Sequence, residues 1–332
     1  MELICPAGTP AAFREAVDAG ADAVYCGFRN ETNARNFPGL NFTCDELATS
    51  IAYGKARGVQ TYVALNTFMR AGAEALWYGA ADDAVQAGAD ALIIADLALM
   101  AYIAERHPDQ RLHVSVQASA FNADAINFLV HSFGAKRLVL PRVLTVADIA
   151  ALAPQVDCEL EVFAFGGLCV MAEGRCSLSS YITGQSPNMD GVCSPASFVR
   201  WDEHADNSRS VRLNGMLIDR FGESEPAGYP TVCKGRYAVG GEVFHALEEP
   251  TSLNTLELLP QLAQAGVVAL KVEGRQRGVA YVRAVASTWR QAIDRYRADP
   301  QRWTTEAAWQ QALGAHAEGQ QTTLGPYHRA WH

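Results

Sequence analysis

A (β/α)₈ barrel is the fold class that the sequence predicts, as a single domain over residues 1–332. Short apolar runs alternate with amphipathic segments eight times along the chain. Several amphipathic segments end at a glycine, as at Gly20, Gly88 and Gly266, a residue that suits the end of a helix. The first turn, Cys5-Pro-Ala-Gly-Thr9, lacks the glycine-rich phosphate fingerprint of a doubly wound open sheet, which is the alternative fold.

The expected strands are short and apolar, which is typical of parallel strands covered by helices on the outside of a barrel. We expect them at 2–5, 22–26, 60–65, 91–95, 112–117, 137–141, 158–165 and 267–273. We expect helices at 10–19, 45–57, 73–87, 97–107, 122–133, 145–154, 255–265 and 279–297. Thr9 before Pro10 predicts a capped helix start, and Thr43 with Glu46 predicts a capping box.

One connection is much longer than the others. A βα loop usually has about 2–6 residues, whereas residues 166–252 separate the seventh strand from the helix that follows it. This inserted region is rich in Gly, Pro, Ser and Asp, so we expect little regular structure in it. It lies on the face where barrel enzymes keep their active sites, and a cross-link through a metal centre would order it.

The amino-acid composition disfavours several classes of function. The chain has 27 Lys and Arg against 36 Asp and Glu, a net charge of −9, which disfavours nucleic acid as a partner. No apolar run is long enough to span a membrane, and the first residues do not resemble a signal peptide, so we expect a cytoplasmic protein. In that reducing compartment clustered thiols indicate metal binding or catalysis rather than disulfides.

Four of the eight cysteines lie in the inserted region with the spacing C-x6-C-x16-C-x39-C. This spacing matches neither a zinc ribbon nor a bacterial ferredoxin. Iron–sulfur is favoured over zinc because all four candidates are thiols, and ordinary buried cysteines are the alternative. The four candidate ligands are Cys169, Cys176, Cys193 and Cys233.

Polar residues at the predicted carboxyl ends of the strands form a second candidate site. Arg142 and Arg275 are the best candidates for substrate contact, because a guanidinium can hold a carboxylate with two hydrogen bonds. The loop from Arg29 to Asn41 follows strand two on the same face, and we expect it to be solvated. The other residues at strand ends are Cys26, Asn66, Asp96, Gln117, Lys271 and Glu273, for which strand capping and salt bridging are equally good explanations.

Several motifs identify a family. They are EVFAFGGLC at 161–169 with GRCSLS at 174–179, CPAGTPAAFREAVDAGADAVYCG at the start, VALN at 63–66, SVQAS at 115–119 and LKVEGRQRG at 270–278. With them the chain resembles the collagenase-like peptidase family of unknown catalytic type, departing from its signature at Gly167, where Ser or Ala is usual. PASFVRW at 195–201, AGYPTVCKGRY at 227–237 and LEEP at 247–250 look most like the UbiU branch of that family, which takes part in oxygen-independent ubiquinone biosynthesis.

The resemblance implies a function. Members of the wider family hydroxylate RNA bases or the ubiquinone ring without oxygen, with prephenate as the implied oxygen donor. In the UbiU branch it implies a [4Fe-4S] cluster on Cys169, Cys176, Cys193 and Cys233, and a heterodimer with a homologous iron–sulfur barrel protein, UbiV. The alternatives are an RNA base hydroxylase and a peptidase. The chain has neither an H-E-x-x-H nor a G-x-S-x-G motif to support the latter.

Overall fold

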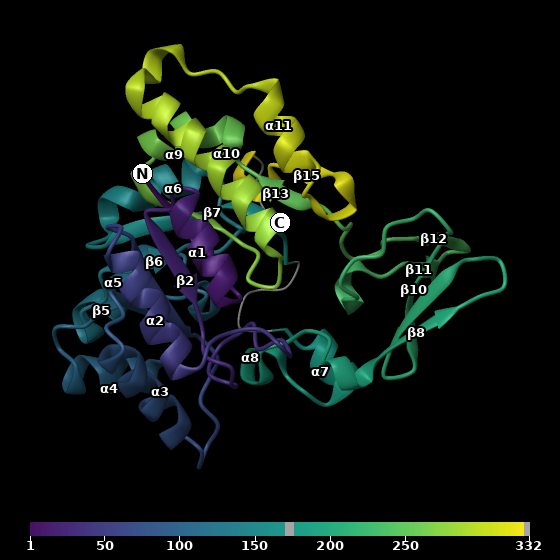
Figure 1. The fold of residues 1–332 in the computed structure, drawn as a ribbon, viewed down its shortest axis with the longest axis horizontal. Helices are drawn as coiled ribbons and strands as arrows, with labels where there is room; N and C mark the ends of the chain where they lie inside the picture. The colour runs from purple at the N-terminus through teal and green to yellow at the C-terminus, as the bar shows by residue number, and fades with distance from the viewer. Residues whose placement is uncertain (170–175, 329–332) are drawn as a thin grey trace.

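The protein is described by a computed structural model that covers residues 1–169 and 176–328. Eight parallel strands run in the order β14-β1-β2-β3-β4-β5-β6-β7, and β14 also pairs with β7, so the sheet closes on itself (Figure 1). The predicted (β/α)₈ barrel is therefore confirmed. Its strands are β1 (Glu2–Pro6), β2 (Ala23–Cys26), β3 (Gln60–Leu65), β4 (Ala91–Ile94), β5 (Arg111–Val114), β6 (Arg137–Val139), β7 (Glu159–Gly167) and β14 (Val267–Val272).

Helices cover the outside of the barrel, and each predicted helix has a counterpart. They are α1 (Pro10–Asp18), α2 (Cys44–Lys55), α3 (Ala75–Gln86), α4 (Leu97–Arg106), α5 (Ala123–Phe133), α6 (Val146–Leu152), α9 (Leu259–Gln264) and α10 (Val279–Ala298). The helix expected at 255–265 is shorter than predicted, because a 3₁₀ turn over Leu256–Leu258 precedes Pro260 in the first turn of α9.

Local sequence explains where these helices begin and end. The Thr9 side chain accepts a hydrogen bond from the Ala12 amide ahead of Pro10. Thr43 and Glu46 form a reciprocal capping box at the start of α2. Past the helix ends, Gly20 and Gly88 have φ of 92° and 88°, a conformation that side chains other than glycine rarely adopt.

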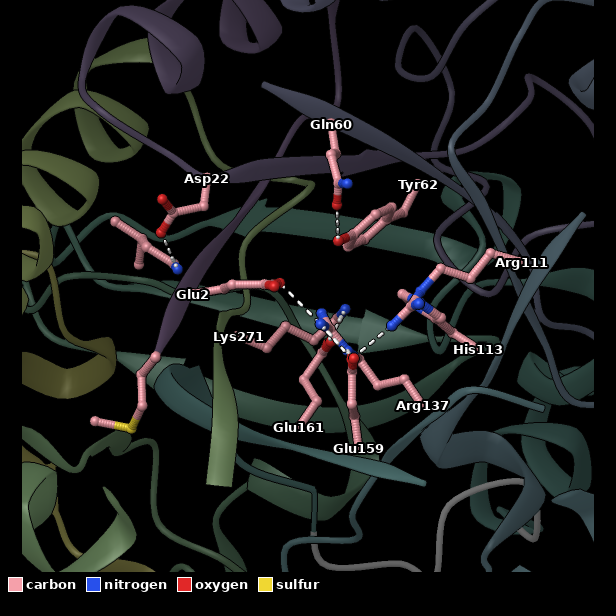
Figure 2. Close-up of polar contacts among 12 residues, drawn as sticks. Glu2, Asp22, Gln60, Tyr62, Arg111, His113, Arg137, Glu159, Glu161 and Lys271 are labelled. Atoms are coloured by element: carbon pink, nitrogen blue, oxygen red, sulfur yellow. Dashed lines mark hydrogen bonds and ion pairs between the residues drawn. The ribbon is translucent and has the colours of Figure 1, made fainter. Parts of the chain in front are cut away.

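The interior of the barrel is polar toward the amino ends of its strands. Figure 2 shows Arg137 and Glu161 between the strands, where both side chains are almost fully buried. Arg137 contacts Glu2 at 2.9 Å and Glu159 at 2.6 Å, and both carboxylates are 39% exposed at the barrel end. Paired acidic and basic side chains thus fill this end of the barrel, where barrels usually contain apolar side chains.

The inserted region has more regular structure than we expected. It contains α7 (Leu178–Thr183), α8 (Pro187–Asp190), an antiparallel sheet of β8 (Val199–Glu203), β9 (Arg209–Leu213) and β10 (Met216–Phe221), and a hairpin of β11 (Tyr237–Val239) and β12 (Glu242–Phe244). The sheet and hairpin project to one side of the barrel (Figure 1). The expectation of a largely irregular loop was wrong because Val211, Leu213, Ile218 and Val232 form a small apolar core of its own.

The chain re-enters the barrel through β13 (Ser252–Asn254), which pairs antiparallel with the end of β7. After α10 the described chain continues through α11 (Ala307–Gly314) and β15 (Thr322–Thr323), which pairs with β13. Within residues 1–169 and 176–328, no helix is both long enough and apolar enough to cross a bilayer.

Candidate functional site

A cavity opens at the carboxyl end of the barrel, next to the inserted region. Its empty volume is about 1090 Å³, with open solvent at the mouth included. The barrel contributes Tyr25, Ala64, Asn66, Ile93, Ser115, Val116, Gln117, Val139, Arg142, Phe163, Lys271, Glu273 and Arg275. The loops and the inserted region contribute Ala34, Arg35, Cys169, Cys176, Leu178, Ser179, Pro187, Asn188, Cys193, Thr231 and Cys233.

The structure brings most of the expected site residues together. The residues that line this one cavity include Asn66, Gln117, Arg142, Lys271, Glu273, Arg275, Cys169, Cys176, Cys193 and Cys233. Asp96 and Cys26 are not among them. Asp96 instead caps α4 by accepting hydrogen bonds from two backbone amides, and Cys26 is packed in the core. Helix capping therefore explains the contacts of Asp96, and core packing explains the position of Cys26.

Glu273 organises the charges of the cavity wall. Its carboxylate lies 2.7 Å from Arg35 and 3.7 Å from Arg142. Burial by itself raises the pKa of Glu273, but the two guanidinium groups outweigh it, so the pKa is below its ordinary value. The cavity therefore holds an ionised carboxylate that fixes two of its arginines in place.

Aromatic rings also contact the cations of the cavity. The guanidinium carbon of Arg142 lies 3.5 Å from the centre of the Phe163 ring, and that of Arg275 lies 5.5 Å from the Tyr25 ring. Arg275 also donates to the Asn33 side chain at 3.2 Å. Burial lowers the pKa of Arg275 to about 10, which leaves it charged at neutral pH.

Among the residues that the structure describes, the cavity carries an excess of positive charge. Arg35, Arg142, Lys271 and Arg275 face two carboxylates, Glu273 in the wall and Glu161 behind Lys271. The net charge of the whole chain is −9, so this local excess is opposite in sign to the protein as a whole. A cationic cavity favours a ligand or cofactor that is an anion.

Arg35 is a site residue that the sequence reasoning missed. We expected the loop after strand two to be solvated, but Thr32 and Asn33 are fully buried and Arg35 reaches the cavity. Asn33 holds the loop by donating to the Phe28 carbonyl and accepting from the Arg35 amide at 2.8 Å. The available signal was the position of this polar run, directly after a strand on the active face.

The four cysteines share one side of the cavity. Burial raises the pKa of the Cys193 thiol to about 11, the Arg35 guanidinium opposes this, and the Cys176 and Cys233 thiols raise it further. These electrostatic effects require the thiols to be close to one another. Among the described residues, however, no group of three or more His, Cys, Asp or Glu side chains is arranged so that it could hold a metal ion.

The donor set nevertheless fits an iron–sulfur cluster in its chemistry. Four thiols can supply all the protein ligands of a [4Fe-4S] cluster. A cluster held by four thiolates carries negative charge, and the cationic wall that includes Arg35 lies beside these thiols. The same thiols could hold zinc, as the sequence also allowed.

Contacts within the inserted region hold the segments that carry the cysteines. The Tyr229 hydroxyl accepts from the Ser194 amide at 2.8 Å and donates to the Ser194 carbonyl at 3.0 Å. These bonds tie the segment after Cys193 to the one before Cys233. Lys234, next to Cys233, forms an ion pair with Glu318 of the C-terminal segment.

Comparison with known proteins gives the family. The family model described as peptidase family U32 matches residues 8–328. The chain is 30% identical to the tRNA hydroxylation protein P1 of Bacillus subtilis (strain 168) over 319 residues, which is 94% of this chain and 67% of that protein. It is 31% identical to the tRNA hydroxylation protein P of Escherichia coli (strain K12) over 314 residues, which is 88% of this chain and 68% of that protein.

A third relative has a more specific name. The 23S rRNA 5-hydroxycytidine C2501 synthase of Escherichia coli (strain K12) is 28% identical over 297 residues, which is 89% of this chain and 39% of that protein. The chain thus spans about two thirds of the first two relatives and less than half of the third. Since the family model covers the barrel apart from β1, the inserted region and most of the C-terminal segment, the chain belongs to peptidase family U32.

Proposed function

We propose that the protein is an iron–sulfur subunit of an oxygen-independent hydroxylase that acts on a ubiquinone precursor ring. The observation that carries this proposal is the cavity itself, in which four thiols and four cationic side chains line one space at the mouth of the barrel. Relatives with 30–31% identity are named as hydroxylation proteins, which supports hydroxylation as the class of reaction.

The cluster would be held by Cys169, Cys176, Cys193 and Cys233. When bound, a [4Fe-4S] cluster supplies one-electron redox chemistry close to the substrate. Arg35 in the surrounding wall would provide positive charge that offsets the charge of the thiolates. Zinc in the same position would order the inserted region but supply no electrons.

A small dianionic donor would bind over the barrel mouth, and prephenate is the donor that the family resemblance implies. Arg142 and Arg275 are both buried, and both line the cavity. Charged hydrogen bonds to a carboxylate are strongest in such a partly dry site. Asn66 and Gln117 add neutral polar groups that can orient the rest of the donor.

The ring substrate is inferred from the branch motifs, all of which lie in the inserted region. AGYPTVCKGRY contains Cys233 and also Tyr229, the residue that fastens the segment after Cys193. PASFVRW leads into β8, where Trp201 is 43% exposed. In the UbiU branch these features accompany a partner, and we propose a heterodimer with a homologous barrel protein, UbiV.

Hydroxylation of an RNA base is the second candidate, because the curated relatives described above are named for tRNA and rRNA hydroxylation. The acidic net charge weighs against it, since binding to phosphate backbones depends on basic residues. Peptide hydrolysis has less support. His204 follows β8 and is hydrogen-bonded to Ser210 of β9, and Ser210 is 3% exposed, so it does not offer a free nucleophile.

The proposal is tested by purifying the protein without oxygen and measuring iron and sulfide. We expect four of each per chain for a [4Fe-4S] cluster, and loss of both after Cys193→Ser or Cys233→Ser. Cys44→Ser is the matched control, because Cys44 is exposed on the barrel surface and should not alter the iron content. Full iron content in both cluster variants would overturn the ligand assignment.

The substrate is tested in cells that lack the gene and grow without oxygen. We expect them to lose ubiquinone and to recover it with the intact gene but not with Cys193→Ser. Mass spectrometry of tRNA and rRNA from the same cells tests the second candidate. Normal anaerobic ubiquinone together with a missing hydroxylated nucleoside would replace the quinone reading with the RNA reading.

A further inference from the structure

Lys271 is a buried lysine that opens onto the cavity. It lies at the carboxyl end of β14, is 5% exposed, and donates to Glu161 Oε1 at 2.7 Å. Its ammonium nitrogen lies 4.0 Å from the centre of the Tyr25 ring. The chain has only three other lysines. Of these, Lys55 and Lys136 are exposed, and Lys234 is paired with Glu318.

Glu161 is held firmly beside this lysine. Its side chain is 1% exposed, and its second oxygen faces Arg137 at 3.5 Å (Figure 2). Arg137 is in turn fixed by Glu159 and Glu2 at the far end of the barrel. Glu161 can therefore exchange a proton with Lys271 without a change of rotamer.

The surroundings of Lys271 favour its neutral amine form more strongly than water does for an exposed lysine. Burial lowers the pKa of Lys271, the ion pair with Glu161 opposes this, and the positive charges of Arg275 and Arg137 lower it further, so that the pKa falls below its usual value. Lys234 differs, because Glu318 raises its pKa despite burial. Only the neutral form of a lysine is a nucleophile.

We propose that Lys271 forms a reversible imine with the keto carbon of a 2-oxo acid whose carboxylate is bound by Arg275. The inference rests on the proposed function in one respect, that a small carboxylated donor occupies this cavity. Lys271 and Arg275 lie near the same Tyr25 ring, at 4.0 and 5.5 Å, so one small molecule can reach both. The keto and carboxylate carbons of a 2-oxo acid are directly bonded, which matches two groups placed this close together.

The step balances without an oxidant or a reductant. The Lys271 ammonium gives a proton to Glu161, and the free amine adds to the keto carbon, forming the C–N bond of a carbinolamine. Glu161 then returns the proton to the hydroxyl group, which leaves as water when the C–O bond breaks. The products are a protonated imine, one water and the original Glu161 carboxylate, and hydrolysis reverses the step.

The imine can be trapped in the full-length protein purified without oxygen. We would incubate it with 2-oxoglutarate and sodium cyanoborohydride, which reduces an imine to a stable secondary amine. Intact mass should increase by one reduced 2-oxoglutarate adduct, and peptide mapping should place the adduct on Lys271. Lys55 and Lys136 in the same sample are internal controls for non-selective labelling. A saturating adduct elsewhere, or no adduct on Lys271, would overturn the proposal.

Two variants separate this role from a merely structural one. Lys271→Arg keeps the positive charge beside Glu161 but cannot form an imine, so the adduct should disappear while iron content stays normal. Glu161→Gln leaves Lys271 as a neutral amine but removes the acid that returns the proton to the carbinolamine hydroxyl, so the rate of trapping should fall at least tenfold. An unchanged trapping rate in Glu161→Gln would refute the role of Glu161.

The outcomes distinguish this inference from the proposed function. Absence of the adduct in a protein that binds its cluster and supports anaerobic ubiquinone synthesis would reject the imine alone. An adduct on Lys271 in a protein with no part in hydroxylation would reject the proposed function and keep the 2-oxo acid site.

Discussion

Replacing Glu161 by Gln should destabilise the protein, and the loss should be larger at pH 7 than at pH 9. In the wild-type protein Glu161 lies 2.7 Å from Lys271, with both side chains almost fully buried. The substitution leaves the Lys271 ammonium without its carboxylate, whereas Arg137 keeps Glu2 and Glu159. A buried lone ammonium is expensive, so Lys271 will lose its proton instead.

The ordinary pKa of lysine limits the size of this effect. The unfolded chain holds Lys271 with a pKa near 10.5. Keeping a lysine neutral at pH 7 then costs at most about 4.8 kcal/mol, because each of the 3.5 pH units costs about 1.36 kcal/mol. At pH 9 only 1.5 units remain, and the limit falls to about 2 kcal/mol. In the Glu161→Gln variant the unfolded state binds more protons than the folded state, so its free energy of unfolding rises with pH.

Urea unfolding at both pH values measures the difference in the free energy of unfolding between Glu161→Gln and wild type. Glu159→Gln is the matched control, because Glu159 lies on the same strand and is 39% exposed. Its effect should be equal at the two pH values, because its partners Arg111 and Arg137 stay charged at both. A Glu161→Gln penalty that is the same at pH 7 and pH 9 would refute the reasoning, since it would mean that Lys271 does not change its charge.

Three further predictions concern other parts of the chain. Arg142→Lys and Arg275→Lys each keep the charge but lose the planar fork, so anaerobic ubiquinone should fall at least tenfold while iron content stays normal; full ubiquinone in both would discard the carboxylate site. Burial, with help from nearby Arg and Lys charges, lowers the pKa of His113 well below 6.5. The unfolded chain therefore takes up the proton first, and the free energy of unfolding should fall by about 1.4 kcal/mol per pH unit below 6.5, a slope that urea titrations should find absent in His113→Gln. Thr43→Ala removes the capping box with Glu46 and should cost about 1 kcal/mol in urea unfolding, and a cost near zero would show that the cap is dispensable.

The barrel could be predicted from the sequence because its signals are local. Glycines after helices, caps such as Thr9, and apolar runs each specify a few residues, and a barrel repeats these units. The sequence of the antiparallel sheet in the inserted region also contains a local hairpin motif. Asn214-Gly215 between two apolar strands is a strong hairpin motif, and both residues have positive φ, of 46° and 85°.

The candidate site was only partly predictable, for a different reason. Residues at strand ends share one face of a barrel whatever the rest of the chain does, which is why Arg142 and Glu273 could be placed together. Arg35 could not, because its position depends on a loop whose shape is set by the buried side chain of Asn33. The charge of Lys271 depends on Glu161, and these residues are 110 positions apart in the sequence.

The pairing of β7 with β13 has a consequence for how such proteins diversify. Gly167 pairs with Ser252 and Gly166 with Leu253, so the chain leaves the barrel and returns to it at the same point. Pairing of β7 with β13 therefore closes the inserted region into a loop, and the entropic cost of closing a loop grows only slowly with its length. The segment between the two strands can change in length at little entropic cost, but it also carries the four cysteines that line the cavity. The cationic residues Arg142, Lys271 and Arg275 belong to the barrel instead, so their placement does not depend on the length of that segment.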